Sequence, residues 1–519
     1  MVVDNFQENW AKRLLAVSQS SRARWLSKQG MVPLPRITTL KTLSVGTDCS
    51  GAEGPIFALK ALGLPFSQKW AAETAPHARR WITTVSGLEE DRVLGDMVDR
   101  NHGLLPSVDL YCCGFPCKPW SRLNHYSQYW EDANARPYEA LTAMLETVEA
   151  KEPALAIFEN VIGIKRFMAD LKSSMSAVLR KYHILWLEIC PRMLGHALAR
   201  PRLYFLAIHR GCAVVDDPLR LRDLAMSIVN GLRQGLEAPL MDRLLDDDHP
   251  WVQAHIKQGS SLSRCSVVKK CQPTKKAKKT MPKWRQKHAA MRKELQSECQ
   301  VPEMPPLAGD FRLPDRAQDS LEIAWILHGG RADMCVDASQ SCDRMPVSFD
   351  GLCPTMTPRG RYIVMARRRE ICPEERLLLH GFPLSAIKLS KEKLQLKPHQ
   401  LNSLAGNCMH VESVGTVIVL GLSLLRGLRR PPQFQAKSES AFLEVQWGTT
   451  PVSSEQDQLS TTRRQQGQHK QARNAKVNMR KDKVMKVRTK KAKVVKTPRK
   501  KSGFAVYESN ISKLCKHYG

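Results

Sequence analysis

The sequence lacks an apolar run of the length that a membrane-spanning helix requires. The nearest candidate, VGTVIVLGLSLL at 414–425, falls short of the ~20 residues needed and indicates a buried helix instead. The N-terminus also lacks the apolar core of a secretory signal peptide. We therefore expect no membrane partner. Fifteen cysteines without a secretory signal indicate free thiols in a reducing compartment.

Two segments are almost without acidic residues. Residues 463–501 hold 17 lysines and arginines and a single acid, Asp482, and residues 264–293 hold 12 basic residues and no acid. Subtracting their net charges of +16 and +12 from the chain's +30 leaves only +2 for the rest. Such segments bind phosphate backbones through counterion release without reading base sequence. We therefore predict contacts with nucleic acid, the alternative being solvated segments that only add solubility.

Elsewhere in the sequence, strand patterns alternate with helix patterns. Helices are predicted at 56–63, 75–85 and 138–153, and strands at 42–48, 67–73, 108–113, 154–160, 182–190 and 202–210. The alternation predicts a parallel α/β sheet with helices on both faces. Ligands of such sheets bind at the carboxyl ends of the strands. Glu73, Cys117 and Glu159 all fall at predicted strand ends, so we expect them to share one cleft.

Changes in this pattern predict the domain organisation. A helix at 411–428 is expected to pack back on the sheet, and RRPPQFQ (429–435) is expected to end the fold. The predicted parts are a basic N-terminal arm, helical or flexible, at 1–36; a main lobe at 37–210 completed by 353–430; a smaller domain at 211–352 with the basic insert 264–293; and a disordered basic tail at 436–519.

Two short stretches suggest chemistry. In GFPCKPWS (114–121), two prolines stiffen the loop around Cys117, which suits a reactive thiol, although a buried structural cysteine is the alternative. The small-residue turn DCSGAEGP (48–55) follows a strand, and Glu73 lies 22 residues past Gly51. That spacing is typical of an acid that binds ribose hydroxyls of a cofactor; the alternative is a surface glutamate.

Five motifs together resemble one family. GFPCKPWS, FENVIG (158–163), RPRLYFLAI (200–208), CPEERLLLHGFP (372–383) and LAGNCM (404–409) are similar, in this order, to the motif set of the cytosine-5 DNA methyltransferases. The resemblance covers 41–428 with a gap at 211–350, where that family places its target-recognition domain. It implies a Rossmann-like class I methyltransferase sheet with a second, smaller target-recognition domain.

The resemblance implies a catalytic set. Cys117 matches the nucleophile, which acts as a thiolate on carbon 6 of a cytosine flipped out of duplex DNA. Glu159 matches the acid that engages ring nitrogen 3 and the exocyclic amine, and Asn160 supports that turn. Arg202 matches the arginine on the carbonyl oxygen of the base, with Arg200 as its neighbour.

The resemblance also implies S-adenosylmethionine as the methyl donor. Gly51 and Gly54 match positions that line it, Glu73 the acid on its ribose, Asp96 a contact to adenine, and Asn407 a residue that closes the pocket. No metal is expected, because the cysteine spacings do not match a zinc pair.

Four positions depart from the family pattern. Cys49 stands where phenylalanine is usual, and Glu53 stands where glycine is usual. We expect Glu53 to add charge beside the cofactor. Lys118 replaces a glutamine after the nucleophile, and Leu198 stands where glutamine is common. Because the three central catalytic positions remain, we favour an active enzyme.

Other interpretations stay open at this level. An RNA cytosine methyltransferase of the same family, with RNA as the partner, would suit the basic segments equally, although its recognition region is usually shorter. A DNA-binding protein with a decayed cofactor pocket would explain the departures. A dinucleotide oxidoreductase would share only the glycine turn. The basic stretch 490–501 further predicts a nuclear location. The sequence predicts neither the target site nor the oligomeric state.

Overall fold

The computed structural model describes residues 2–39, 41–121, 135–232, 239–258, 283–296, 301, 303–309, 311–342, 344–428 and 440–447. The chain divides into two compact units, Met1–Gly448 and Thr449–Gly519. The second unit, and with it most of the predicted basic tail and the stretch 490–501, lies outside the described residues. Most of the basic insert, 264–282, does so as well.

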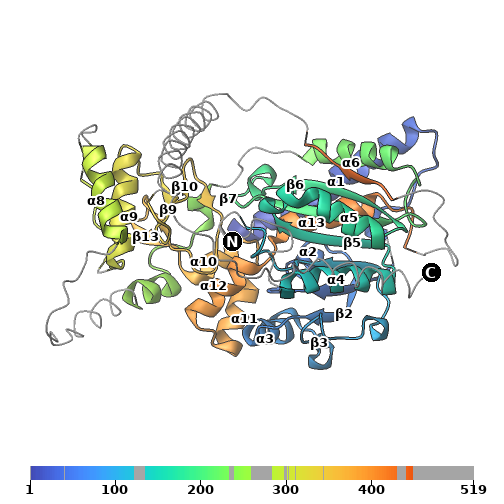
Figure 1. The fold of residues 1–519 in the computed structure, drawn as a ribbon, viewed down its shortest axis with the longest axis horizontal. Helices are drawn as coiled ribbons and strands as arrows, with labels where there is room; N and C mark the ends of the chain where they lie inside the picture. Colours follow the sequence, from blue (N-terminus) through green and yellow to red (C-terminus); the bar gives the residue numbers. More distant parts are fainter. Residues whose placement is uncertain are drawn as a thin grey trace, which may run out of the picture. The chain divides into compact units, whose positions relative to one another are not determined.

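An eight-stranded sheet forms the centre of the first unit, with the strand order β14-β6-β8-β5-β4-β1-β2-β3 (Figure 1). The strands are β1 (Leu43–Asp48), β2 (Phe66–Ala72), β3 (Val93–Leu94), β4 (Leu110–Cys113), β5 (Leu155–Val161), β6 (Tyr182–Ile189), β8 (Arg202–His209) and β14 (Phe442–Glu444). Each predicted strand is thus present. Their buried residues are mostly apolar, as expected for a sheet that is covered on both faces.

The sheet is mixed rather than parallel throughout, which corrects our expectation. β1, β2, β3, β4 and β5 pair in parallel, but β8 runs antiparallel to both β5 and β6. Parallel neighbours need a crossover that is usually an α-helix. The connection from β6 to β8 contains only a 3-10 turn, Pro191–Leu194, and the short strand β7 (Leu198–Ala199). The chain therefore returns beside β6 in the opposite direction.

Two helix layers cover this sheet (Figure 1). One hydrophobic cluster packs a first group of helices on one face, together with residues of the later helices within 373–407, and a second cluster packs two helices on the other face. The first group is α1 (Val2–Lys28), α2 (Gly54–Ala61), α3 (Pro76–Trp81), α6 (Pro218–Leu232) and α13 (Val411–Ser423); the second is α4 (Ala135–Lys151) and α5 (Met168–Val178). The predicted α/β class, with helices on both faces of one central sheet, is therefore confirmed.

Helix α13 lies in the middle of the first cluster. All 13 of its residues are buried, and a Cβ on Gly421 would lie 2.5 Å from the Leu155 side chain of β5, so glycine permits the close approach. Among the described residues, one stretch, Pro398–Ser423, is long and apolar enough to cross a membrane, but 89% of its most apolar window is buried inside the fold. That burial is typical of a core helix.

The N-terminal region is a packed helix, the first of the two forms expected for it. Trp10, Leu14 and Trp25 of α1 are buried, and the Trp25 indole donates a hydrogen bond to Asp223 of α6 at 2.8 Å. Because α6 shares the core with α1, residues 218–232 pack with the main lobe and not with the smaller domain to which we assigned them.

Two other boundaries differ from the sequence-based ones. Strand β14 pairs in parallel with β6 through Phe442–Glu444, so the fold continues beyond 436, where we expected only disorder. The apolar residues Phe442 and Leu443 pair with β6. The prediction missed them because it used the average composition of the whole tail. Residues 353–370, assigned to the main lobe, instead contribute to the second sheet or to the short pairing beside it.

The second sheet has four antiparallel strands in the order β10-β9-β12-β13. A separate parallel pair, β11 with β7, joins this region to the main lobe. The strands are β9 (Cys335–Asp337), β10 (Val347–Ser348), β11 (Cys353–Pro354), β12 (Tyr362–Val364) and β13 (Arg369–Glu370); further helices are α8 (Lys283–Gln296), α9 (Asp315–Leu327), α10 (Pro373–Leu379), α11 (Leu384–Leu394) and α12 (Pro398–Asn407).

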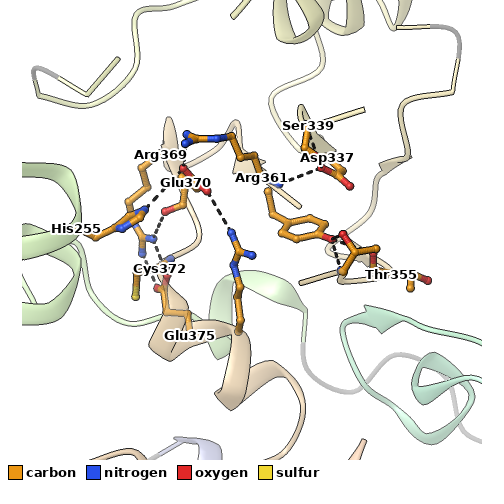
Figure 2. Close-up of polar contacts among 12 residues, drawn as sticks. His255, Asp337, Ser339, Thr355, Arg361, Arg369, Glu370, Cys372 and Glu375 are labelled. Atoms are coloured by element: carbon orange, nitrogen blue, oxygen red, sulfur yellow. Dashed lines mark hydrogen bonds and ion pairs between the residues drawn. The ribbon is translucent and has the colours of Figure 1, made fainter. Parts of the chain in front are cut away.

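A buried ionic network fixes this sheet to α10 (Figure 2). Arg369 Nη2 lies 2.8 Å from Glu375 Oε1, and both side chains are fully buried. Arg369 Nε also donates to Asp247 at 2.7 Å. Glu370 accepts hydrogen bonds from Arg361 and Arg376, each at 3.1 Å. The network therefore links the chain that enters the smaller domain, the second sheet and α10.

We expect Arg369→Met to lower the free energy of unfolding by about 3–5 kcal/mol, because a buried carboxylate loses its partner. Denaturant titration measures it. Arg331→Met is the control, since it breaks ion pairs whose side chains are 41–56% exposed, and it should cost at most about 1 kcal/mol. Similar losses in both variants would show that the Arg369–Glu375 pair contributes no more than a surface pair.

Candidate active site

The loop after β4 presents Cys117. Asn160, near the end of the neighbouring strand β5, donates from Nδ2 to the Phe115 carbonyl at 3.1 Å, and its Oδ1 accepts from the Val161 backbone at 2.8 Å. The buried Trp120 ring meets Phe115 edge to face with centroids 5.3 Å apart. The loop is therefore held from both sides of Cys117, and the Cys117 side chain itself is partly exposed.

Glu159 and Arg202 form an ion pair across two strands. Val161 of β5 is opposite Arg202 of β8 in the antiparallel register. Glu159 lies two residues before Val161 on the same face of β5, so the Glu159 and Arg202 side chains leave the sheet at the same edge. Arg202 Nε lies 2.9 Å from Glu159 Oε1, and the side chains are 12% and 13% exposed. A carboxylate with a fixed partner and limited access to water is thus available to a ligand.

The charges around Cys117 act on its thiol in opposite directions. Burial raises the pKa of Cys117, and the negative charge of Glu159 raises it further, whereas the positive charges of Arg202 and Arg200 lower it. The net direction is upward. The structure therefore brings together Cys117, Glu159, Arg200 and Arg202, which were predicted from three separate motifs.

Arg200 is turned toward the backbone around the site. Its Nη1 donates to the Met356 carbonyl at 2.8 Å, and its Nη2 donates to the carbonyls of Gly406 at 3.2 Å and Cys408 at 3.0 Å. The side chain is almost fully buried. Arg200 therefore ties two distant segments to the active-site edge, a role that its position beside Arg202 did not indicate.

The turn after β1 is strongly curved and is anchored by Glu73. Cys49, Gly51 and Glu53 all have positive φ, at 49°, 55° and 63°. Glu73 Oε2 accepts from the Gly51 backbone at 2.9 Å, and Oε1 accepts from two further backbone N–H groups, each at 2.9 Å. Glu73 is thus not an isolated surface glutamate but a support of the glycine turn.

The remaining predicted cofactor residues lie around this turn. A Cβ on Gly54 would lie 2.7 Å from the Met409 carbonyl, so glycine is needed there for packing. A Cβ on Gly51 would lie 3.8 Å from the Asn407 carbonyl. The Asn407 side chain is exposed and donates to Ser403 at 3.3 Å. Asp96 follows β3 and accepts from the Val98 backbone at 3.0 Å.

Glu53 is turned into the interior of the fold. Its side chain is fully buried and accepts from Thr47 Oγ1 at 2.8 Å and from Gln68 Nε2 at 3.0 Å. Burial raises the pKa of Glu53 to about 7, partly offset by these hydrogen bonds. The carboxyl group thus supports the interior of the turn between β1 and β2.

The other departures from the family pattern are spread across the site. Leu198 is fully buried in β7, where it pairs with Cys353 of β11. Lys118 is exposed beside Cys117. The Cys49 sulfur contacts the Met97 sulfur at 3.6 Å. None of these three side chains disrupts the Glu159–Arg202 pair.

Sequence reasoning missed the support beneath the glycine turn. Asp48, at the end of β1, accepts from Arg100 Nη1 at 2.7 Å and from the Tyr111 hydroxyl at 2.6 Å. The Trp70 indole also donates to it at 3.3 Å. An aspartate directly before a glycine turn was the available signal, but its partners are 22 to 63 residues away in sequence.

A buried group of possible metal ligands lies behind Arg200. Within the described residues, His196, His410 and Glu412 have ligand atoms within 4.8 Å of one another. Burial raises the pKa of Glu412 to about 7, and the nearby Arg243 opposes this. Burial and the charge of Arg243 also lower the pKa of His196. A cation would meet the positive field of Arg243, and the Glu412 carboxylate already lies 3.8 Å from His196 Nε2 and 3.5 Å from His410 Nδ1.

Comparisons with known proteins identify the family of this sequence. The model of the C-5 cytosine-specific DNA methylase family matches residues 49–418. The DNA (cytosine-5-)-methyltransferase DMT5 of Cryptococcus neoformans is 24% identical over 437 residues, covering 76% of this chain. The chain spans only 18% of the length of that relative.

Two solved structures are similar over most of their length. The S. pombe Dnmt2 methyltransferase has 14% identity and a TM-score of 0.42, covering 74% of this chain and 98% of its own. A putative DNA modification methyltransferase encoded within an E. coli prophage has 16% identity and a TM-score of 0.41, with coverages of 74% and 99%. Because the family model spans most of the sequence, the predicted family is confirmed: the chain carries a cytosine-5 DNA methyltransferase domain and belongs to the C-5 cytosine-specific DNA methylase family.

Proposed function

We propose that this protein methylates carbon 5 of cytosine in DNA through a covalent adduct with Cys117. The observation that carries the proposal is the convergence of Cys117, the Glu159–Arg202 pair and Arg200 at one edge of the sheet. Two features support DNA as the substrate class: the family model and the basic segments of the sequence.

The proposed first step is addition of the Cys117 thiolate to carbon 6. A sulfur–carbon bond forms, and the electrons of the carbon 5–carbon 6 double bond move into the ring toward nitrogen 3, leaving carbon 5 nucleophilic. Because the target atom is hidden inside duplex DNA, the cytosine has to be flipped out, at a cost of roughly a few kcal/mol. The partly exposed Cys117 on its stiff loop is suited to meet such a base.

Glu159 and Arg202 are proposed to hold the base. Protonation or hydrogen bonding of nitrogen 3 by Glu159 balances the charge that moves into the ring, and Arg202 binds the carbonyl oxygen. Loss of the carbon 5 proton and then of the thiolate restores the aromatic ring. Asn160 keeps the Cys117 loop in place through its bond to Phe115.

The turn after β1 fits S-adenosylmethionine. Its positive φ values leave a curved backbone next to Glu73, and a carboxylate has about four acceptor positions, of which backbone N–H groups use three. Glu73 would therefore retain capacity for a ribose hydroxyl, with Gly51, Gly54, Asp96 and Asn407 around it. When bound, this cofactor supplies the methyl group that carbon 5 receives.

We expect Glu73→Ala to weaken S-adenosylmethionine binding by roughly 10–100-fold, because charge-assisted hydrogen bonds to ribose and turn are lost. Isothermal titration calorimetry measures the affinity. Glu89→Ala removes a carboxylate that is 67% exposed in a surface pair with Arg92 and should leave affinity unchanged. Equal affinities in the two variants would place the ribose elsewhere.

Covalent trapping tests the proposed function. The protein is incubated with S-adenosylmethionine and duplex DNA or RNA that contains 5-fluorocytosine, whose fluorine cannot leave as a proton does. A denaturant-stable adduct with DNA supports the proposal. An adduct only with RNA would assign the activity to RNA methylation. No adduct with either, by a folded protein that binds the cofactor, would contradict the enzyme assignment for these substrates.

We further propose that the protein acts in the nucleus and that its basic segments add nonspecific affinity for DNA. The support is compositional: 490–501 is rich in lysine and arginine, and 463–501 carries a net charge of +16. Fractionation of cells that express the chain with and without 490–501 would test the location.

A further inference from the structure

The hydroxyl group of Tyr362 holds the backbone on both sides of Met356. Tyr362 is the first residue of β12 and is fully buried. Its hydroxyl oxygen accepts from the Thr357 backbone N–H at 2.6 Å and donates toward the Thr355 carbonyl at 3.1 Å. One phenol therefore fixes the peptide groups that flank Met356.

Arg200 also contacts this segment, at the backbone of Met356. The Met356 carbonyl accepts from Arg200 Nη1 at 2.8 Å. One residue earlier, Thr355 Oγ1 donates to the Ala199 carbonyl at 2.6 Å, directly before Arg200 in sequence. We call residues 353–357 the connecting strip. It is bonded to Tyr362 on one side and to the chain that carries Arg200 on the other.

Tyr362 is itself fixed by the second sheet and the ionic network. The Arg376 guanidinium lies over its ring, 5.0 Å from the centroid, and Arg376 Nη2 donates to Glu370 at 3.1 Å. A Cβ on Gly360 would lie 2.2 Å from the Tyr362 hydroxyl oxygen, so the turn before β12 packs directly on this group. Figure 2 shows Thr355 and Glu370 within the same polar region.

We propose that Tyr362 is a positioning residue for methyl transfer: its hydroxyl holds the connecting strip, and the strip holds Arg200 beside Cys117. The inference rests on the proposed function, because it assigns Tyr362 to the same active site. It makes the placement of the second sheet, whose strands β9 and β10 lie within the predicted target-recognition region 211–352, a determinant of the charge around the nucleophile.

Tyr362→Phe tests this without removing the ring. Arg200 stabilises the Cys117 thiolate, so a loosened Arg200 should raise the pKa of Cys117 and leave roughly threefold less thiolate at a pH below that pKa. The measurement is the pH dependence of Cys117 alkylation by iodoacetamide, followed on the Cys117 peptide by mass spectrometry. Methyl transfer should show a fall in kcat of about threefold or more, with little change in KM for DNA.

Tyr182→Phe is the matched control. Tyr182 is also a buried tyrosine whose hydroxyl donates to a backbone carbonyl, that of Pro153 at 2.9 Å. A general loss of stability would move the alkylation profile in both variants, whereas positioning through the connecting strip moves it only in Tyr362→Phe. Unfolding curves of both variants verify that the fold is retained. If Tyr362→Phe does not fold, Thr355→Val breaks the same connection at its other side.

A double variant tests the route. If Tyr362 acts through Arg200, adding Tyr362→Phe to Arg200→Lys should not shift the Cys117 profile beyond the shift of Arg200→Lys alone. An additive shift, or a Tyr362→Phe profile equal to wild type, would overturn the inference. Alkylation requires neither DNA nor cofactor, so this result is separate from the failure or success of the trapping experiment.

Discussion

Cys117→Ala should abolish both the 5-fluorocytosine adduct and methyl transfer. Loss of a covalent nucleophile typically costs several orders of magnitude, and we expect at least ~10³–10⁴-fold. The position of Cys117 beside Glu159 and Arg202 leaves the base contacts intact in this variant. Binding of duplex DNA should therefore change little, and the loss should appear in kcat.

Cys342→Ala is a suitable control for that experiment. Cys342 is a buried cysteine, 4% exposed, between β9 and β10 of the second sheet. Its substitution removes one thiol without touching the candidate active site, so adduct formation should persist. Residual methylation by Cys117→Ala above about a tenth of the wild-type rate would refute covalent catalysis through this residue.

Glu159→Gln should change methylation and thiol reactivity in opposite directions. Without the carboxyl proton for nitrogen 3, methyl transfer should fall by roughly 10²–10⁴-fold, the range typical of a lost general acid. The negative charge of Glu159 raises the pKa of Cys117, so its removal lowers that pKa. At a fixed pH below that pKa more of Cys117 is thiolate, and iodoacetamide should alkylate it faster.

Slower methyl transfer together with faster Cys117 alkylation distinguishes a local effect of Glu159 from a general loss of structure. A partly unfolded protein would also expose Cys117, but it would expose the other buried cysteines as well, which peptide-resolved alkylation detects. Glu188→Gln is the control, because Glu188 of β6 is 40% exposed in its ion pair with Lys165. We expect neither the rate of methyl transfer nor the rate of Cys117 alkylation to change in this variant. Slower alkylation of Cys117 in Glu159→Gln would mean that the carboxylate activates the thiol instead.

The sequence predicted the strands of the main lobe and the convergence of Cys117 and Glu159. Both follow from local chemistry: apolar runs such as LYCC can only be buried, and strands in neighbouring parallel positions end at one edge of a sheet. The spacing of Glu73 from Gly51 predicted an acid that binds the ribose of a cofactor. The structure adds that Glu73 holds the Gly51 backbone.

The direction of β8, the addition of β14, the burial of Glu53 and the contacts of Arg200 required the tertiary structure. The sequence by itself determined which residue types are available for thiol addition and where the apolar segments lie, because these depend on composition and local period. Only the tertiary structure decided that Arg200 bonds Met356, 156 residues away, and that Glu53 turns inward. The physical reason is that burial and hydrogen-bond partners are set by segments that meet only after folding, and no local pattern encodes their distance.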